Sequence, residues 1–267
     1  MSIWHAVILG ILQGATEFLP ISSSGHLVLG QRLFGLNEPE LVFDISVHVG
    51  TLGAVVIVYW ADIRQMIVAV LRWLGRREGA GTAPQLRLAG LIVAGSVPTA
   101  LIGIFFQTAA DRLFSSTALV GAMLLVTGFL LWGTRHTPAS QKGLERFSLW
   151  PALAIGTMQG LAILPGISRS GSTIAVALFM GIERRLAARF SFLLSIPAII
   201  GAVLLNLFDA SFHQGGVVGV TAAGTAAAFG VGYLALRWLI HLVQRKKLHF
   251  FTPYCFLLGL TALLLRF

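Results

Sequence analysis

The stretch that decides the fold is Gln13-Gly-Ala-Thr-Glu-Phe-Leu-Pro-Ile-Ser-Ser-Ser-Gly-His26, because a second stretch of the chain repeats it. The second copy reads Gln159-Gly-Leu-Ala-Ile-Leu-Pro-Gly-Ile-Ser-Arg-Ser-Gly-Ser172. The two copies align without a gap at a separation of 146 residues, which is the distance from Gln13 to Gln159. In each copy an apolar segment is interrupted by proline, serine and glycine, which are strong breaks even in a membrane helix.

The positions that differ between the two copies carry ionisable groups. Glu17 aligns with Ile163, Ser23 aligns with Arg169, and His26 aligns with Ser172. One copy therefore contributes a carboxylate and an imidazole, and the other contributes a guanidinium. The pattern predicts one shared site built from both copies.

Composition places the chain in a membrane. It has 267 residues, of which 56% are hydrophobic and 11% are charged, and its mean hydropathy is +0.85. Soluble domains carry roughly 25% charged residues. Helices satisfy their own backbone hydrogen bonds in lipid, so we expect an all-α integral membrane protein. The single cysteine, Cys255, excludes an intramolecular disulfide.

The net charge of +9 indicates membrane orientation and not a nucleic-acid partner. Four loops between apolar segments hold 14 of the 19 lysine and arginine residues. Short basic loops are retained in the cytoplasm. The apolar segments predict spans over residues 43–61, 88–107, 115–133, 190–208, 217–240 and 253–266, and all four basic loops are placed on the cytoplasmic side. The apolar part of the first basic connector, residues 66–74, is expected to lie along the membrane interface.

Both motif segments are predicted to be re-entrant helix pairs, over residues 3–34 and 149–182. The second has basic loops on both flanks, so it must enter and leave by the same face. Three spans separate the pairs, so the first pair enters from the opposite face. The chain thus forms one membrane domain of two inverted repeats, about 1–134 and about 149–267, as in many transporters. The alternative, in which each motif segment is one kinked span, places its basic flanks on opposite sides of the membrane.

Ionisable residues at membrane depth are costly and usually functional. Glu17, His26 and Arg169 are therefore the leading candidates. A Ser-x-Ser-Gly sequence before a helix offers hydroxyls, free N–H groups and a positive dipole end to an anion. Arginine adds a planar fork that matches phosphate oxygens. The predicted phosphate contacts are Ser22, Ser24, Ser168, Ser170, Gly171 and Thr173.

Hydrolysis needs a nucleophile, a proton carrier and groups that neutralise charge. Ser23 or water could attack, and His26 lies three residues further on, on the same helical face. Glu17 could act as a base or hold a cation with Gln13, one turn earlier. Asp44 and His48 repeat the one-turn spacing and are candidates to line the same cavity; capping at a helix start is the alternative for Asp44.

The two motifs resemble those of the undecaprenyl-diphosphate phosphatase family, also called bacitracin-resistance proteins. The matching residues are Gln13-x-x-x-Glu17, Phe18-Leu-Pro-Ile-Ser-Ser-Ser-Gly-His26 and Pro165-Gly-Ile-Ser-Arg-Ser-Gly171. One position departs from the pattern: Gln13 stands where many members have glutamate, which weakens any mechanism that needs two carboxylates.

The resemblance implies an enzyme of the bacterial inner membrane that converts undecaprenyl diphosphate to undecaprenyl phosphate, with its site facing the periplasm. It implies Glu17, Ser23, His26 and Arg169 as catalytic residues, a divalent cation (Mg²⁺ or Ca²⁺), and bacitracin as a competitor that binds the substrate. The nucleophile is left open between Ser23, His26 and water.

The strongest rival is a transporter or flippase of polyprenyl phosphate or another anion, because inverted re-entrant repeats are typical of transporters. A scaffold without catalysis does not account for ionisable residues at membrane depth. Glycine-rich spans also permit close packing between chains, so a homodimer is open.

Overall fold

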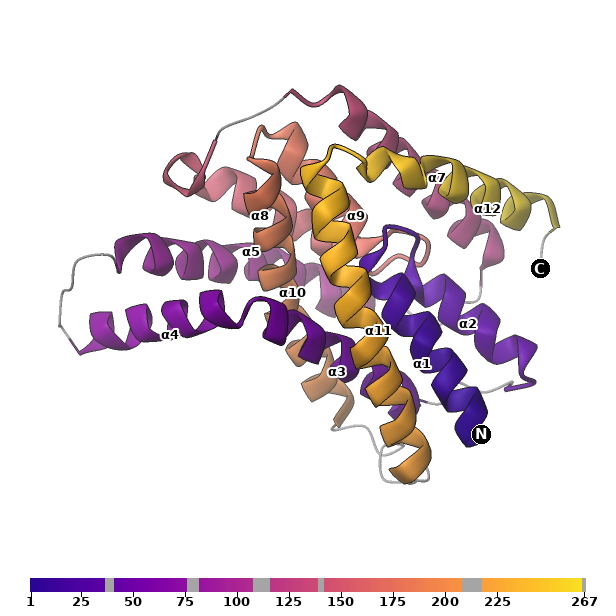
Figure 1. Ribbon diagram of the computed structural model, residues 1–267. Coiled ribbons are helices and arrows are strands. Elements are labelled where there is room, and N and C mark those ends of the chain that lie inside the picture. The colour runs from indigo at the N-terminus through magenta and orange to yellow at the C-terminus, as the bar shows by residue number, and fades with distance from the viewer. Residues whose placement is uncertain (37–40, 76–81, 108–115, 139–141, 208–217, 266–267) are drawn as a thin grey trace.

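The computed structural model describes residues 1–36, 41–75, 82–107, 116–138, 142–207 and 218–265, and within them it contains helices and no strand (Figure 1). The first half contains α1 (Ile3–Phe18), α2 (Ser23–Leu33), α3 (Leu41–Val58), α4 (Trp60–Leu74), α5 (Ala83–Gln107), α7 (Thr117–Gly133) and the short η1 (Thr134–His136). The second contains η2 (Leu144–Arg146), α8 (Leu149–Leu161), α9 (Arg169–Phe179), α10 (Arg184–Leu207), α11 (Val218–Gln244), η4 (Leu248–Phe251) and α12 (Thr252–Leu265).

The all-helical class and the membrane character are confirmed. Four described helices are long and apolar enough to cross a membrane, namely α5, α7, α10 and α11. The pair α3 and α4 passes the same test but bends by 76°, so the described part of the chain holds four such helices, or five if the bent pair is one span. The shorter α12 is apolar as well. The arrangement of six spans and two re-entrant pairs stays a prediction.

The described helices differ in their bounds from several of the predicted spans. The span predicted over 43–61 ends at Val58 and bends into α4, so the first basic connector begins as a helix. The span predicted from residue 190 begins at Arg184, which places three arginines inside the first turns of α10. The helices predicted over 88–107 and 217–240 extend to Ala83 and Gln244, respectively. The predicted ends at 115, 208, 217 and 266 lie outside the described residues.

Both motif segments are broken helices. In the first, α1 and α2 are separated at Leu19–Ser22, around Pro20. In the second, α8 and α9 are separated by residues 162–168, which include Pro165. The two breaks meet in the interior, where the Gly166 amide donates to Ser22 Oγ over 3.1 Å and Ser170 Oγ donates to the Phe18 carbonyl over 2.7 Å. Side chains from both motifs therefore reach one place.

Equivalent glycines pack the two halves together. Helix α1 lies against α11, and α8 lies against α5 (Figure 1). A methyl group on Gly10 would overlap the carbonyl of Gly224, and one on Gly156, 146 residues later, would overlap the carbonyl of Gly95. The partners of these two glycines, Gly95 and Gly224, are 129 residues apart, whereas the motif copies are 146 residues apart. Beyond α3, corresponding positions of the two halves are therefore separated by 17 fewer residues. The insertion that accounts for the change includes α4, a helix of 15 residues.

Gly156→Ala is expected to lower the apparent unfolding temperature in detergent, because the new methyl group meets backbone that cannot rotate away. Overpacking of this kind costs about 1–3 kcal/mol. Gly103→Ala is the matched control, since a methyl group there meets nothing within 4 Å. An unchanged unfolding temperature in Gly156→Ala would contradict the close approach of α8 and α5.

Candidate functional site

The carboxylate of Glu17 is the centre of the polar cluster. It is the second-last residue of α1, and its side chain is 4% exposed. Gln13 Nε2 donates to Oε2 over 2.9 Å, and Ser23 Oγ donates to the same oxygen over 2.7 Å. Arg169 Nη2 donates to Oε1 and forms a salt bridge with it. A carboxylate buried this deeply must be paired, and here it takes partners from both motifs.

Arg169 comes from the second broken helix. It is the first residue of α9, whose N-cap Ser168 accepts a hydrogen bond from the Gly171 amide over 3.2 Å. The side chain of Arg169 is 23% exposed, so it is less completely buried than that of Glu17. The cluster thus places one cation and one anion in contact, with a helix N-terminus beside them.

His48 of α3 contributes an imidazole near Glu17. Its Nε2 lies 3.8 Å from Glu17 Oε2, and its Nδ1 bonds to the Asp44 carbonyl over 2.7 Å. The side chain of Asp44 accepts instead from Gln31 Nε2 of α2, over 2.6 Å. The structure therefore brings His48 to the candidate site and places the Asp44 carboxylate against α2.

His26 points away from Ser23, although both lie in α2. Its Nδ1 is 2.8 Å from the Ser22 carbonyl, and its Nε2 hydrogen-bonds to the hydroxyl of Tyr254 on α12. A carbonyl can only accept, so Nδ1 carries a proton, and in the neutral imidazole Nε2 accepts from Tyr254. No hydrogen bond joins Ser23 to His26 in the described chain. The expected Ser23–His26 pair is thus replaced by Ser23–Glu17 and His26–Tyr254. Tyr254 was not predicted from the sequence, because it lies in an apolar segment and belongs to no motif.

The other serines and the threonine hold the two breaks in shape. Ser22 and Ser24 lie 3.4 Å apart through their Oγ atoms, and the corresponding pair Ser168 and Ser170 lies 3.3 Å apart. Thr173 Oγ1 donates to the Arg169 carbonyl over 2.7 Å. The hydroxyls predicted to contact phosphate are therefore engaged with the protein in this structure.

Two backbone positions explain why the breaks need their residue types. Ser22 has a φ of 68°, the left-handed region that costs a non-glycine residue roughly 1–2 kcal/mol. The bond from the Gly166 amide to Ser22 Oγ holds it there. A methyl group on Gly171 would lie 2.7 Å from Cβ of Pro20, so the first break can approach α9 only at a glycine.

Helices α7 and α12 support the two breaks in corresponding ways. Thr127 Oγ1 of α7 donates to the Gly166 carbonyl over 2.9 Å. Cys255 Sγ of α12 donates to the Pro20 carbonyl over 3.3 Å, and Pro20 is the counterpart of Gly166 at a separation of 146 residues. The cysteine is buried and acts as a structural contact.

Few side chains in the cluster around Glu17 could bind a divalent cation. The described residues contain no group of three or more histidine, cysteine, aspartate or glutamate side chains that would hold a metal. Gln13 Oε1 is nevertheless a buried oxygen, beside Glu17, that has no hydrogen-bond partner among the described residues. Mg²⁺ is commonly held by one or two carboxylates together with substrate phosphates. Glu17 and Gln13 fit that pattern only when a phosphate ligand supplies further oxygens.

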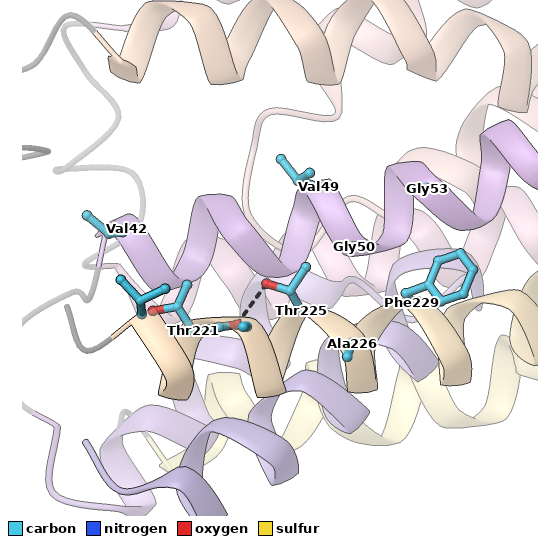
Figure 2. Close-up of a pocket in the computed structure, with 10 residues that line it drawn as sticks. Val42, Val49, Gly50, Gly53, Thr221, Thr225, Ala226 and Phe229 are labelled. Atoms are coloured by element: carbon cyan, nitrogen blue, oxygen red, sulfur yellow. Dashed lines mark hydrogen bonds between the residues drawn. The ribbon is translucent and has the colours of Figure 1, made fainter. Parts of the chain in front are cut away.

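An apolar groove lies on another side of α3. Figure 2 shows Val42, Val49 and Gly53 of α3 facing Thr221, Thr225 and Phe229 of α11 around it. Its volume is about 720 Å³. Val49 lines the groove, whereas its neighbour His48 reaches toward Glu17. None of the predicted site residues lines this groove, so α3 separates it from the polar cluster.

Comparison with known proteins agrees over nearly the full chain. The family model described as bacitracin resistance protein BacA matches residues 6–261. A protein of Desulforapulum autotrophicum named undecaprenyl-diphosphatase is 48% identical over an alignment of 274 residues, covering 100% of this chain and 99% of the relative. One of Desulfosudis oleivorans with the same name is 54% identical over 262 residues, covering 96% and 95%. One of Carboxydothermus hydrogenoformans is 43% identical over 270 residues, covering 100% and 98%.

Proposed function

The chain belongs to the bacitracin resistance protein BacA family, and on that basis we propose that it hydrolyses undecaprenyl diphosphate to undecaprenyl phosphate and inorganic phosphate. The reaction returns the lipid carrier to peptidoglycan and envelope synthesis, and resistance to bacitracin fits the family name. The observation that carries this function is the contact of Glu17 with both Ser23 and Arg169, which joins the two broken helices.

In the proposed mechanism Arg169 binds the diphosphate. Its side chain is partly exposed, and a phosphate offers its guanidinium the same paired oxygens as the Glu17 carboxylate. When the arginine turns to the substrate, the Glu17 carboxylate loses its cation and becomes more basic. The N–H groups at the start of α9 face the same anion.

Ser23 is the proposed nucleophile. Its Oγ attacks the terminal phosphorus, its proton passes to Glu17 Oε2, and the bond to the bridging oxygen breaks to release polyprenyl phosphate. Water then cleaves the phosphoserine and releases inorganic phosphate. His26 and Tyr254 are proposed to position the start of α2, since their bond ties that helix to α12. A bound Mg²⁺ or Ca²⁺, held by Glu17, Gln13 and substrate oxygens, would supply further neutralisation of phosphate charge.

The finer topology belongs to the same proposal. Two inverted repeats, each with one re-entrant pair and three spans, are supported by the meeting of the two breaks and by the recurring glycine contacts. The positive-inside rule then predicts that the basic loops lie in the cytoplasm. That the site opens toward the periplasm of the inner membrane is what the resemblance to the family implies. The proposal also includes a homodimer, because the glycine-rich spans permit close packing between chains.

Ser23→Ala is expected to reduce phosphate release from undecaprenyl diphosphate by at least about 100-fold, because the attacking oxygen is lost. Purified protein in detergent is assayed for inorganic phosphate. Ser46→Ala is the matched control, since among the described residues that hydroxyl bonds to the Val42 carbonyl of its own helix and to no site residue. A transporter has no need of a nucleophile. Full activity of Ser23→Ala would rule out the phosphoserine and leave water or His26; no release by the folded wild-type protein would favour the transporter.

A further inference from the structure

A second polar cavity lies between the start of α10, the junction of α3 and α4, and the end of α11. Its volume is about 1000 Å³. The side chains that decide its chemistry are Tyr59, Asp62, Glu183, Arg184, Arg185 and Arg189. None of these residues contacts the cluster around Glu17, and no step of the proposed hydrolysis uses them.

The charges of this cavity are only partly balanced. Arg189 Nη2 pairs with Asp62 Oδ1 at 2.5 Å, while its Nε is buried without a hydrogen-bond partner in the described chain. Arg184 donates to the Thr137 carbonyl and hydroxyl, and its Nε is likewise unsatisfied. Arg185 is exposed and makes no salt bridge to a described residue. Three guanidinium groups thus face two carboxylates.

The arginines at the start of α10 stand at a helix end that disfavours cations. Arg184 and Arg185 begin α10, a helix of 24 residues whose N-terminus carries partial positive charge. Cations are disfavoured there, whereas a phosphate is favoured by both the helix end and the guanidinium groups. An anion bound between them would stabilise the start of the helix.

Tyr59 is an independent sign of a ligand. The residue is only 7% exposed, and its ring stacks on Phe192 with centroids 6.2 Å apart. Tyr59 lines the cavity, and its hydroxyl is not among the fully buried unpaired atoms, so it keeps some access to a ligand. Buried tyrosine hydroxyls usually find a partner. This one is available to donate to an oxygen of a bound molecule.

A separate apolar groove lies further along two of the same helices, α4 and α10. It is lined by Ile63, Met66 and Val70 of α4, by Ile92 of α5, and by Leu193 and Ile196 of α10, among others, and its volume is about 480 Å³. Ile63 follows Asp62 directly, and Leu193 lies one turn beyond Arg189. The polar cavity and the apolar groove therefore follow one another along α4 and α10, and a ligand that occupies both must be amphipathic.

We propose that the polar cavity and the apolar groove together form a binding site for an anionic phospholipid of the surrounding membrane. Its phosphate is bound by Arg185, Arg189 and the Tyr59 hydroxyl, and one acyl chain lies in the groove between α4, α5 and α10. Basic pockets between membrane helices are suited to anionic head groups. The lipid would stabilise the bend between α3 and α4 and would leave the chemistry at Glu17 unchanged.

The test measures lipid retention by native mass spectrometry of the full chain in neutral detergent. Phosphatidylglycerol and phosphatidylcholine with identical acyl chains are titrated, and inorganic phosphate is added in a separate arm. The wild-type protein is expected to retain phosphatidylglycerol preferentially. Arg185→Gln is expected to weaken that retention about tenfold, as for loss of a hydrogen bond to a charged group, and Tyr59→Phe by a smaller factor.

Arg64→Gln is the matched control, because Arg64 is an exposed arginine of α4 that lines neither the polar cavity nor the apolar groove. It should bind phosphatidylglycerol as the wild-type protein does, and Arg185→Gln should release phosphate from undecaprenyl diphosphate at the wild-type rate. The lipid site is wrong if Arg185→Gln binds like wild type or if Arg64→Gln loses as much binding. It is also wrong if inorganic phosphate displaces the lipid at equal concentration, which would indicate a site for a free anion.

Discussion

Arg169→Ala is expected to abolish phosphate release, with a loss on the order of 10³ or more in kcat/KM. The guanidinium is the only cation that contacts the cluster from the second motif, and arginine clamps on transferring phosphoryl groups contribute about 10³–10⁵ in rate. The measurement is inorganic phosphate released from undecaprenyl diphosphate by purified protein in detergent, with and without chelator.

Arg169→Lys separates charge from geometry. Lysine keeps the positive charge but cannot offer two parallel N–H groups to one phosphate or carboxylate. We expect activity between those of wild type and Arg169→Ala. Arg237→Ala is the control for loss of an arginine, since Arg237 is exposed and bonds to the Tyr233 hydroxyl on its own helix. Substantial release by folded Arg169→Ala would contradict the proposed site.

Glu17→Gln is expected to reduce kcat by about 10³, because the proton acceptor of Ser23 loses its charge. It should also lower the apparent unfolding temperature. Removing one member of a buried ion pair costs about 3–5 kcal/mol, since the remaining charge is left unpaired. Glu17→Asp keeps the charge on a shorter side chain and should retain more of both activity and stability.

The double substitution Glu17→Gln with Arg169→Gln distinguishes a catalytic role from a structural one. It removes both charges, so no unpaired charge remains, and we expect the unfolding temperature to recover toward that of wild type. Activity should stay lost. If Glu17→Gln keeps more than about a tenth of the wild-type kcat, Glu17 is not the general base. If the double variant recovers activity together with stability, both residues act only in folding.

Composition and local patterns were enough to predict the membrane class and the two broken helices. Long apolar segments, and a proline followed by serines and glycine, act on the chain within a few residues. The repeated motif also identified Glu17 and Arg169 as candidates, which the structure places in contact. Their roles in catalysis stay predictions, as does the complete inverted repeat.

Tertiary structure decided which partner each polar group takes. The spacing of Ser23 and His26 allows a shared helical face, but a buried carboxylate needs hydrogen-bond donors and therefore binds Ser23. His26 instead bonds to Tyr254, which is 228 residues away and has no local signal. The 76° bend and the amphipathic α4 interrupt the repeat in a way that a gapless alignment misses. Sequence patterns report local preferences, whereas hydrogen bonds at a buried site are chosen among groups that only folding brings together.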